Sequence, residues 1–247
     1  MPHDNDGGSE IRLVHSSDLH VDDDRIASLH GGDGTGGLRA VLAAGRRLGA
    51  DIVILAGDTF DNHMVAPPTI ERAGRVLAEA GLPIVLLPGN HDPITKDSVY
   101  ARGGFAGIAN LRIVGITDER VIAFPEYGLE FWGNAHHDYN DNVPLRDPVP
   151  RSSRWQVAIG HGHYEPPETW AIPLRPSWLI SDAMIAATGA DYLALGHWDR
   201  PMQVGDGAVP AYYSGSPDWA KTVNLVRLTA NGDVAVTRER LVSPDSD

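Results

Sequence analysis

Five short apolar segments of the sequence are each followed by side chains that can bind a metal ion. The side chains are Asp18 and His20 after residues 11–15, Asp58 after 52–56, Asn90, His91 and Asp92 after 84–88, His161 after 157–159, and His197 and Asp199 after 192–195. One such residue alone is usually a turn or surface residue. Five of them at the same position relative to a β-like segment indicate a shared site.

The residue types restrict the metal that such a site would hold. Carboxylate, amide and imidazole ligands suit manganese, iron, zinc or cobalt better than calcium. The chain has no cysteine, which excludes thiolate ligands, disulfides and cysteine nucleophiles. Ligands in open α/β sheets bind beyond the carboxyl ends of the strands, so we expect these side chains to meet at one edge.

The elements that would position these residues alternate between β-like and helix-like segments, which is typical of an α/β domain. Apolar residues at helical spacing predict helices, and short apolar or alternating runs predict strands. We expect helices at 38–48, 69–80 and 181–187. Strands are expected at 11–15, 51–56, 83–87, 111–115, 121–124, 129–132, 155–159 and 192–195, with late antiparallel strands at 212–213, 223–228 and 233–241.

The chain shows no internal repeat and no segment typical of a domain linker. We therefore expect a single domain at 11–241, between a polar N-terminal tail, 1–10, and a C-terminal tail, 242–247. The glycine-rich segment 31–37 is expected to be a loop, and no Lys-Ser/Thr pair follows it, as a phosphate-binding loop would require. Residues 140–153 are expected to form a long surface loop.

Composition excludes several classes of protein. Apolar residues make up 42% of the chain and the formal net charge is −13. This charge disfavours a protein that grips long duplex nucleic acid by its phosphates, because such proteins are usually basic. No apolar run approaches the ~20 residues needed to cross a membrane, and the N-terminus does not read as a secretory signal. We expect a cytoplasmic protein without a membrane partner.

The motifs resemble those of the calcineurin-like metallophosphoesterase family. The matching segments are DLH at 18–20, GDTFD at 57–61, GNHD at 89–92, GH at 160–161 and GHWD at 196–199. Their wording is most similar to the DNA-repair exonuclease branch, which includes the nuclease subunit of the bacterial SbcCD complex. The resemblance implies an α/β fold in which a two-layered β-sandwich is flanked by helices, a four-layer αββα arrangement with a two-metal site at its edge.

The resemblance also implies a role for each motif residue. Two divalent cations, with manganese favoured and iron, zinc or cobalt as alternatives, would clamp the phosphate and activate a bridging hydroxide. The implied ligands are Asp18 and His20 for the first cation, Asp58 for both, and Asn90, His161 and His197 for the second. His163 is the alternative to His161, which we prefer because it comes first after its strand.

Two further residues of the same motif are implied to act in catalysis. His91 would contact the scissile phosphate and protonate or stabilise the leaving oxygen. Asp92 would orient the His91 ring. Asp61 is expected either to orient the site or to cap a helix. His136 and His137 are interpreted as surface residues, and the acidic run 22–24 as a solvated turn.

Asp199 departs from the family pattern, which usually has a histidine at this position as the fourth protein ligand of the first cation. An aspartate can still bind through oxygen, but it is shorter than histidine, so the backbone must move inward, a water must intervene, or the cation keeps an open position. The extra negative charge predicts a preference for monoanionic diesters over dianionic monoesters, and for harder ions such as manganese.

The substrate expected from these observations is a phosphodiester, such as a short or single-stranded nucleic acid or a nucleotide. Trp198 and Arg200 are candidates for a rim that stacks a base and contacts a phosphate, with Tyr212 and Tyr213 beside them. A nucleotide or cyclic-nucleotide phosphodiesterase is the alternative enzyme, and a catalytically weakened binding subunit is a further alternative. Nothing in the sequence indicates an ATPase partner, although the exonuclease branch leaves room for one.

Overall fold

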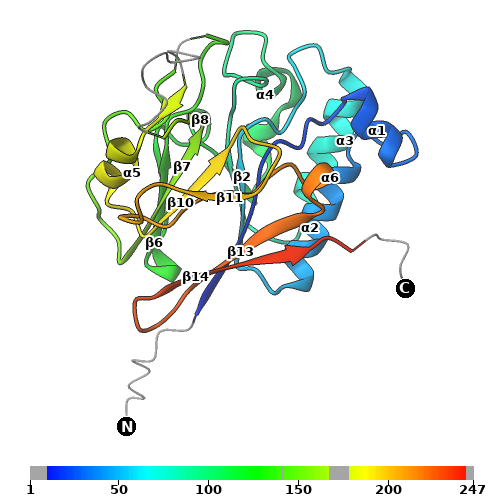
Figure 1. Ribbon diagram of the computed structural model, residues 1–247. Coiled ribbons are helices and arrows are strands. Elements are labelled where there is room, and N and C mark those ends of the chain that lie inside the picture. Colours follow the sequence, from blue (N-terminus) through cyan, green and yellow to red (C-terminus); the bar gives the residue numbers. More distant parts are fainter. Residues whose placement is uncertain (1–9, 141, 167–177, 243–247) are drawn as a thin grey trace.

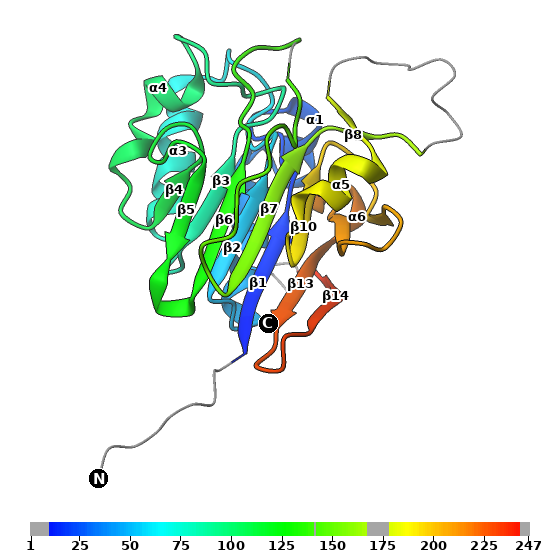
Figure 2. The ribbon, with the colours of Figure 1, turned by 90° about the vertical axis from the view of Figure 1, so that its left-hand side faces the viewer.

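Two six-stranded β-sheets pack face to face at the centre of the molecule, with helices on their outer sides (Figures 1 and 2). The computed structural model describes residues 10–140, 142–166 and 178–242. The layered α/β arrangement agrees with the fold class predicted from the sequence.

The first sheet holds the N-terminal strands and the two last ones. β1, β2, β3 and β4 run parallel to one another, while β13 is antiparallel to β1 and to β14. Its strand order is β14-β13-β1-β2-β3-β4. The bounds are β1 (Ile11–Ser16), β2 (Ile52–Ala56), β3 (Ile84–Leu87), β4 (Leu111–Ile113), β13 (Thr222–Leu228) and β14 (Val234–Arg240).

The second sheet is built from the middle of the chain, in the order β11-β12-β10-β7-β6-β5. β6, β7, β10 and β12 are parallel, and β5 and β11 pair antiparallel at the two edges. The bounds are β5 (Val121–Phe124), β6 (Leu129–Gly133), β7 (Trp155–His161), β10 (Tyr192–Gly196), β11 (Met202–Val204) and β12 (Ala211–Tyr213). A separate parallel pair joins β8 (His163–Tyr164) to β9 (Leu179–Ile180).

The helices begin at residues that favour helix starts. Asp23, Ser98 and Ser181 cap three of them through side-chain oxygens, and proline stands in the first turn of two others. The helices are α1 (Asp24–Leu29), α2 (Gly36–Arg47), α3 (Pro67–Ala78), α4 (Val99–Gly103), α5 (Asp182–Thr188) and α6 (Pro217–Ala220), with 3₁₀ turns η1 (Phe105–Gly107) and η2 (Pro125–Tyr127).

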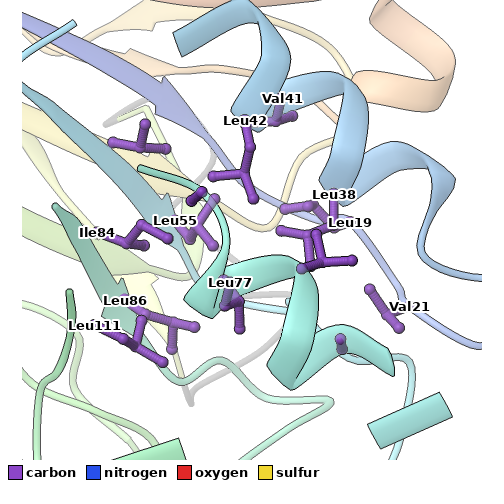
Figure 3. Packing of buried hydrophobic residues seen from close by; sticks show 14 of the residues in the cluster. Leu19, Val21, Leu38, Val41, Leu42, Leu55, Leu77, Ile84, Leu86 and Leu111 are labelled. Carbon is purple, nitrogen blue, oxygen red and sulfur yellow. The ribbon is translucent and has the colours of Figure 1, made fainter. Parts of the chain in front are cut away.

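Three apolar clusters hold the layers together. One lies between the two sheets and includes Ile54, Phe131 and Tyr192. A second lies between the first sheet and the helices α2, α3 and α4, where Leu42, Leu77 and their neighbours pack against strand side chains (Figure 3). The third covers the outer face of the second sheet beneath α5. The strands that carry the site motifs are therefore buried on both faces.

Most predicted elements are present within a few residues of their expected bounds, and the strand expected at residues 212–213 pairs antiparallel with β11 but not with the last two strands. Their strand, β12, lies parallel to β10 in the second sheet, whereas β13 and β14 belong to the first. The segment 31–37 is also shorter as a loop than expected, because α2 begins at Gly36. The short elements α1, α4, α6, β8, β9 and β11 were not predicted.

Two regions complete the description. Within the described part of 140–153 there is no helix or strand, as expected for a loop. The predicted tails lie almost wholly outside the described residues. Among the described helices, none is long and apolar enough to cross a membrane.

The inter-sheet cluster predicts a large stability cost for the loss of one side chain. Ile54 on β2 is fully buried there, so we expect Ile54→Ala to lower the free energy of unfolding by about 2–5 kcal/mol. Met64, which is 78% exposed, supplies the control, and Met64→Ala should change it by less than about 0.5 kcal/mol. Urea unfolding followed by circular dichroism measures both, and equal small effects would contradict this packing.

Candidate metal centre

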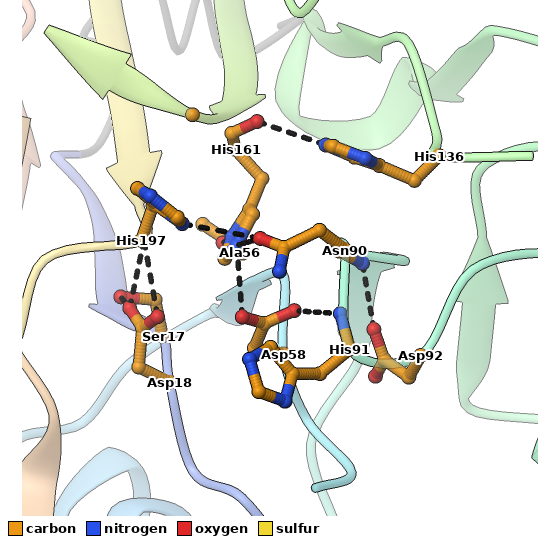
Figure 4. Close-up of polar contacts among 12 residues, drawn as sticks. Ser17, Asp18, Ala56, Asp58, Asn90, His91, Asp92, His136, His161 and His197 are labelled. Atoms are coloured by element: carbon orange, nitrogen blue, oxygen red, sulfur yellow. Dashed lines mark hydrogen bonds and ion pairs between the residues drawn. The ribbon is translucent and has the colours of Figure 1, made fainter. Parts of the chain in front are cut away.

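The five motif-bearing strand ends meet where the carboxyl ends of the two sheets come together (Figure 4). β1, β2 and β3 contribute from the first sheet, and β7 and β10 from the second. The site is thus shared between two sheets rather than placed at the edge of one. The backbones approach closely here: a Cβ on Gly196 would lie 1.9 Å from the carbonyl oxygen of Ala56, so only glycine fits at that position.

Four site residues adopt left-handed backbone conformations that are uncommon for residues other than glycine. Their φ angles are +54° for Asp18, +45° for His20, +50° for Asp58 and +107° for His197. Each such conformation costs on the order of 1–3 kcal/mol and persists only where the surrounding structure imposes it. The concentration of this strain at four motif residues indicates a site shaped for binding rather than for stability.

One group of ligand atoms forms around Asp58, Asn90, His161 and His197. Nε2 of His161 lies 3.0 Å from Oδ2 of Asp58. Oδ1 of Asn90 lies 3.1 Å from that same Nε2 and 3.1 Å from Nδ1 of His197. Asp58, His161 and His197 form one of the described groups close enough to hold a metal ion, and the Asn90 oxygen completes a four-atom set.

The ring and the backbone of His161 are each held by a hydrogen bond. Its Nδ1 donates to the carbonyl oxygen of Ala56 at 2.8 Å, which leaves Nε2 directed at the group. Its own carbonyl oxygen accepts a hydrogen bond from Nε2 of His136 at 3.0 Å (Figure 4). His136 is fully buried, so the interpretation of this residue as a surface histidine was wrong, while His137 is exposed as expected.

A second group consists of Asp18, His20 and Asp58. The Asp18 carboxylate is buried and accepts hydrogen bonds from Oγ of Ser17 at 2.5 Å and from the backbone amide of His197 at 3.0 and 3.1 Å. These donors hold its oxygens in place at the end of β1. Asp58 belongs to both groups, so a single carboxylate joins them.

A third group, His20, Asp61 and His91, lies beside the second. Nδ1 of His91 donates to the backbone carbonyl of Asp61 at 2.7 Å, and the His91 amide donates to Oδ1 of Asp58 at 2.8 Å. Oδ1 of Asp61 lies 3.3 Å from Nδ1 of His20. Asp61 therefore contacts two site histidines. It does not cap α3, because Ala66 is the residue at the capping position of that helix.

The carboxylates favour positive charge at this centre. Burial alone would lower the pKa of His20, but Asp61 and the nearby Asp58 and Asp18 raise it to about 9. Burial likewise opposes protonation of His161, yet Asp58 raises the pKa of that ring to about 9. Burial disfavours the charged form of Asp58, but His161 holds its pKa below the usual range. A donor set that stabilises bound protons this strongly also fits divalent cations.

The structure does not place Asp92 against the His91 ring, so that prediction was wrong. The buried Asp92 carboxylate accepts from the backbone amides of Thr59 at 2.9 Å and Phe60 at 3.1 Å through Oδ2, and from the amide of Gly89 at 2.6 Å through Oδ1. Tyr100 donates its hydroxyl to Oδ2 at 2.6 Å. Asp92 instead ties the loop after β2 to the loop after β3.

Asp199 is exposed and lies outside the three groups of ligand side chains. The geometry therefore does not support it as a direct ligand beside Asp18 and His20. His161, and not His163, joins Asp58 and His197, as preferred from the sequence. Nδ1 of His163 instead accepts a hydrogen bond from Nε1 of Trp198 at 3.0 Å.

The expected aromatic rim is largely occupied by packing. The Trp198 ring stacks on Tyr213 with centroids 4.5 Å apart and planes 9° apart, which covers one face. Tyr213 is buried, and Tyr212 stacks on Tyr192. Arg200 is exposed.

The acidic run 22–24 is not simply a solvated turn, because two of its side chains are engaged. Asp23 caps α1 by accepting from the amide of Ile26. Asp22 accepts hydrogen bonds from the amide of Ala66 and the hydroxyl of Thr69, at the start of α3. The run therefore ties the loop after β1 to two helix starts.

Two buried contributors could not have been found from the motifs. His136 follows β6 in a loop, and Tyr100 lies in α4, and neither belongs to a recognisable pattern. Only the general tendency of buried polar groups to be hydrogen-bonded points to them, and it applies once their burial is known.

Comparison with known proteins agrees with this architecture. The family model described as calcineurin-like phosphoesterase matches residues 11–201. The solved structure of the protein TT1561 from Thermus thermophilus covers 95% of this chain and 100% of its own, at 12% identity and a TM-score of 0.60. The search of curated proteins gives no match.

Larger solved proteins share the fold over part of their length. A Staphylococcus aureus protein described as a candidate 5′-nucleotidase, in complex with alpha-ketoglutarate, covers 97% of this chain but only 56% of its own, at 14% identity and a TM-score of 0.63. A 5′-nucleotidase precursor from Thermus thermophilus matches over 95% of this chain and 54% of its own length, at 14% identity and a TM-score of 0.50. At these identities the likeness establishes the fold alone.

The contacts of Asp92 predict that it is essential to the stability of the site loops. Asp92→Ala leaves three buried amides and one hydroxyl without their acceptor, so we expect a loss of about 2–5 kcal/mol in the free energy of unfolding. Tyr100→Phe removes only one of these hydrogen bonds and should cost about 1 kcal/mol. Urea unfolding compares the two variants, and an Asp92→Ala effect no larger than that of Tyr100→Phe would refute the bracing role.

Proposed function

The chain belongs to the calcineurin-like phosphoesterase family, and from this premise we propose that it hydrolyses phosphodiesters with two divalent cations. The observation that carries the proposal is the position of Asp58, whose carboxylate belongs to two adjacent groups of ligand side chains. A shared carboxylate can hold two like charges close together, which a two-metal phosphoesterase requires.

The residues divide between the two cations as follows. Asp18, His20 and Asp58 would hold the first, and Asp58, Asn90, His161 and His197 the second. When bound, the cations supply Lewis-acid stabilisation of the phosphate oxygens and lower the pKa of a coordinated water. Manganese as the resident metal and a cytoplasmic location remain predictions made from the sequence.

We assign His91 to act on the leaving group. Its ring is exposed beside His20 and Asp58, and Nδ1 is committed to the carbonyl oxygen of Asp61. This contact sets the orientation of the ring and leaves Nε2 as the atom that can reach substrate. When the ring is protonated, Nε2 carries a proton that it donates to the departing oxygen. His91 is therefore the general acid of the proposed reaction.

The charge of the site favours diesters over monoesters. Asp18 and Asp58 belong to the group proposed for the first cation, Asp61 contacts its His20, and Asp199 adds a further carboxylate on the loop after β10. Each of these repels a dianionic monoester more strongly than a monoanionic diester. A single-stranded exonuclease of the DNA-repair branch is the specific form we propose, with a nucleotide or cyclic-nucleotide diesterase as the alternative.

The experiment that tests this function adds Mn, Fe, Zn, Co or Mg to the metal-stripped protein. Bis-p-nitrophenyl phosphate, p-nitrophenyl phosphate and single-stranded DNA are the substrates. We expect metal-dependent hydrolysis, strongest with manganese and faster on diesters than on the monoester. Hydrolysis of no substrate with any metal would refute the enzyme, and a monoester rate far above the diester rate would refute the diesterase.

The role of His91 is tested with the same assay. We expect His91→Ala to lower kcat on bis-p-nitrophenyl phosphate by about 10²–10⁴-fold, because the general acid is lost. Metal content measured by plasma mass spectrometry should stay at the wild-type level, since His91 is not among the proposed ligands. His137→Ala, which removes an exposed histidine outside the site, is the control. An undiminished kcat in His91→Ala would exclude this acid.

The carboxylate of Asp199 is expected to affect the preference for substrate and metal. Asp199→His removes a carboxylate two residues beyond His197 and restores the residue that the family usually has there. We expect the ratio of monoester to diester kcat/KM to rise, or the preferred metal to shift away from manganese. Asp206, which lies on an exposed turn, offers the control Asp206→His. If Asp199→His changes neither the ratio of kcat/KM nor the preferred metal, the charge of Asp199 does not set the preference.

A further inference from the structure

A cavity lies beside the proposed metal ligands. It has a volume of about 380 Å³ and is lined by Asp199, Arg200, Pro201, Trp219 and Ala220. This is within the range of ~300–1,000 Å³ that is typical of small-molecule sites. It joins the loop after β10 to α6, and none of the catalytic or ligand roles above uses Trp219.

The cavity is a near neighbour of the metal centre. Asp199 follows His197 by two residues, so their Cα atoms are at most ~7 Å apart. The backbone of His197 is itself hydrogen-bonded to the Asp18 carboxylate. The carbonyl oxygen of Asp199 accepts from the amide of Ser216 at 3.2 Å, which fixes the loop against the start of α6. The cavity therefore lies on the same loop as His197, a proposed metal ligand.

Trp219 provides an exposed aromatic surface in this cavity. It is 46% exposed, whereas the face of Trp198 that meets Tyr213 is covered. The guanidinium of Arg25, on α1, lies over one face of the Trp219 ring, 4.3 Å from its centre, so a base would have to stack on the opposite face. Arg25 does not line the cavity, so this contact leaves the cavity itself open.

Several cations lie on the segments that form or contact the cavity, although the chain as a whole carries −13. Arg25, Arg200, Lys221 and Arg238 are all exposed, and Nη2 of Arg238 lies 3.4 Å from the carbonyl oxygen of Pro201 in the cavity wall. Among the described residues, none of these four cations forms an ion pair with a carboxylate. Of the described residues that line the cavity, Asp199 alone is acidic.

An exposed tryptophan among arginines next to a phosphoester site has the chemistry of a site for unpaired nucleic acid. Bases stack on aromatic rings without regard to sequence, and arginines contact the backbone phosphates. We propose that the cavity binds the nucleotide next to the scissile phosphate of a single strand, with its base on Trp219 and its outer phosphate at Arg200. This inference rests on the proposed function and specifies its substrate class.

The test measures binding of a 5′-fluorescein oligothymidylate with phosphorothioate linkages, which resist hydrolysis, to the manganese-loaded protein. We expect Trp219→Ala to weaken binding by about 5–100-fold, as for the loss of one stacked base, and Trp219→Phe to retain most of the affinity. Leu29→Ala, which removes an exposed apolar side chain of α1 outside the cavity, is the matched control. Binding of Trp219→Ala equal to wild type, or a loss equal to that of Leu29→Ala, would overturn the proposal.

Two further measurements separate this proposal from a general effect on folding or on the metals. Arg200→Gln should reduce the slope of log affinity against log salt by about 0.7, the value for one lost phosphate contact with a single strand. In steady-state assays, Trp219→Ala should raise KM for an oligonucleotide roughly fivefold more than KM for bis-p-nitrophenyl phosphate, with little change in kcat. Equal changes in both KM values, or an unaltered salt slope, would overturn it.

The two proposals fail in distinguishable ways. If the protein hydrolyses no ester with any metal but Trp219→Ala still loses oligonucleotide affinity, the proposed reaction fails and the binding site stands. If the protein hydrolyses diesters but Trp219→Ala changes KM equally for the oligonucleotide and the small diester, the reaction stands and the nucleotide site is refuted.

Discussion

The contact on which the site depends is the sharing of one buried carboxylate, that of Asp58, between two groups of side chains that could hold a metal ion. Oδ2 faces His161 and Oδ1 accepts the amide of His91, so each oxygen already has a fixed direction. The backbone of Asp58 adopts a left-handed conformation at this position. The Asp92 carboxylate, which accepts the next two amides of the same loop, keeps that backbone from relaxing. The two-sheet architecture sustains this strain, because the strands that lead into the site are buried on both faces and their ends cannot shift without disturbing the core.

The candidate metal centre and the neighbouring cavity differ in the charge of their side chains. Carboxylates gather in the groups that could hold a metal ion, while Arg200 lines the neighbouring cavity and Arg25 contacts its Trp219 ring. The protein as a whole carries −13, so we propose a short unpaired strand rather than a long duplex as its substrate. An exposed aromatic ring beside an arginine suits such a strand.

The sequence predicted the strands and most of the site because both rest on local patterns. An apolar run followed by Gly-Asp or Gly-His fixes where a strand ends and which side chain leaves it, and the structure brings Asp18, Asp58, His161 and His197 together as expected. The features that the sequence did not predict depend on contacts between distant segments. The partner of β12, the burial of His136 and the anchoring of Asp92 arise from loop paths that no local pattern encodes. Asp92 is adjacent to His91 in sequence, yet the carbonyl that meets the His91 ring comes from a loop thirty residues earlier.

We propose that Asp58 joins two cations, and anomalous X-ray diffraction at the manganese edge would locate both of them. Crystals of the manganese-loaded protein should show two anomalous peaks about 3.5–4 Å apart, with the oxygens of Asp58 between them and Asp18 and Asn90 on opposite sides. A single peak, or two peaks that Asp58 does not join, would contradict the account.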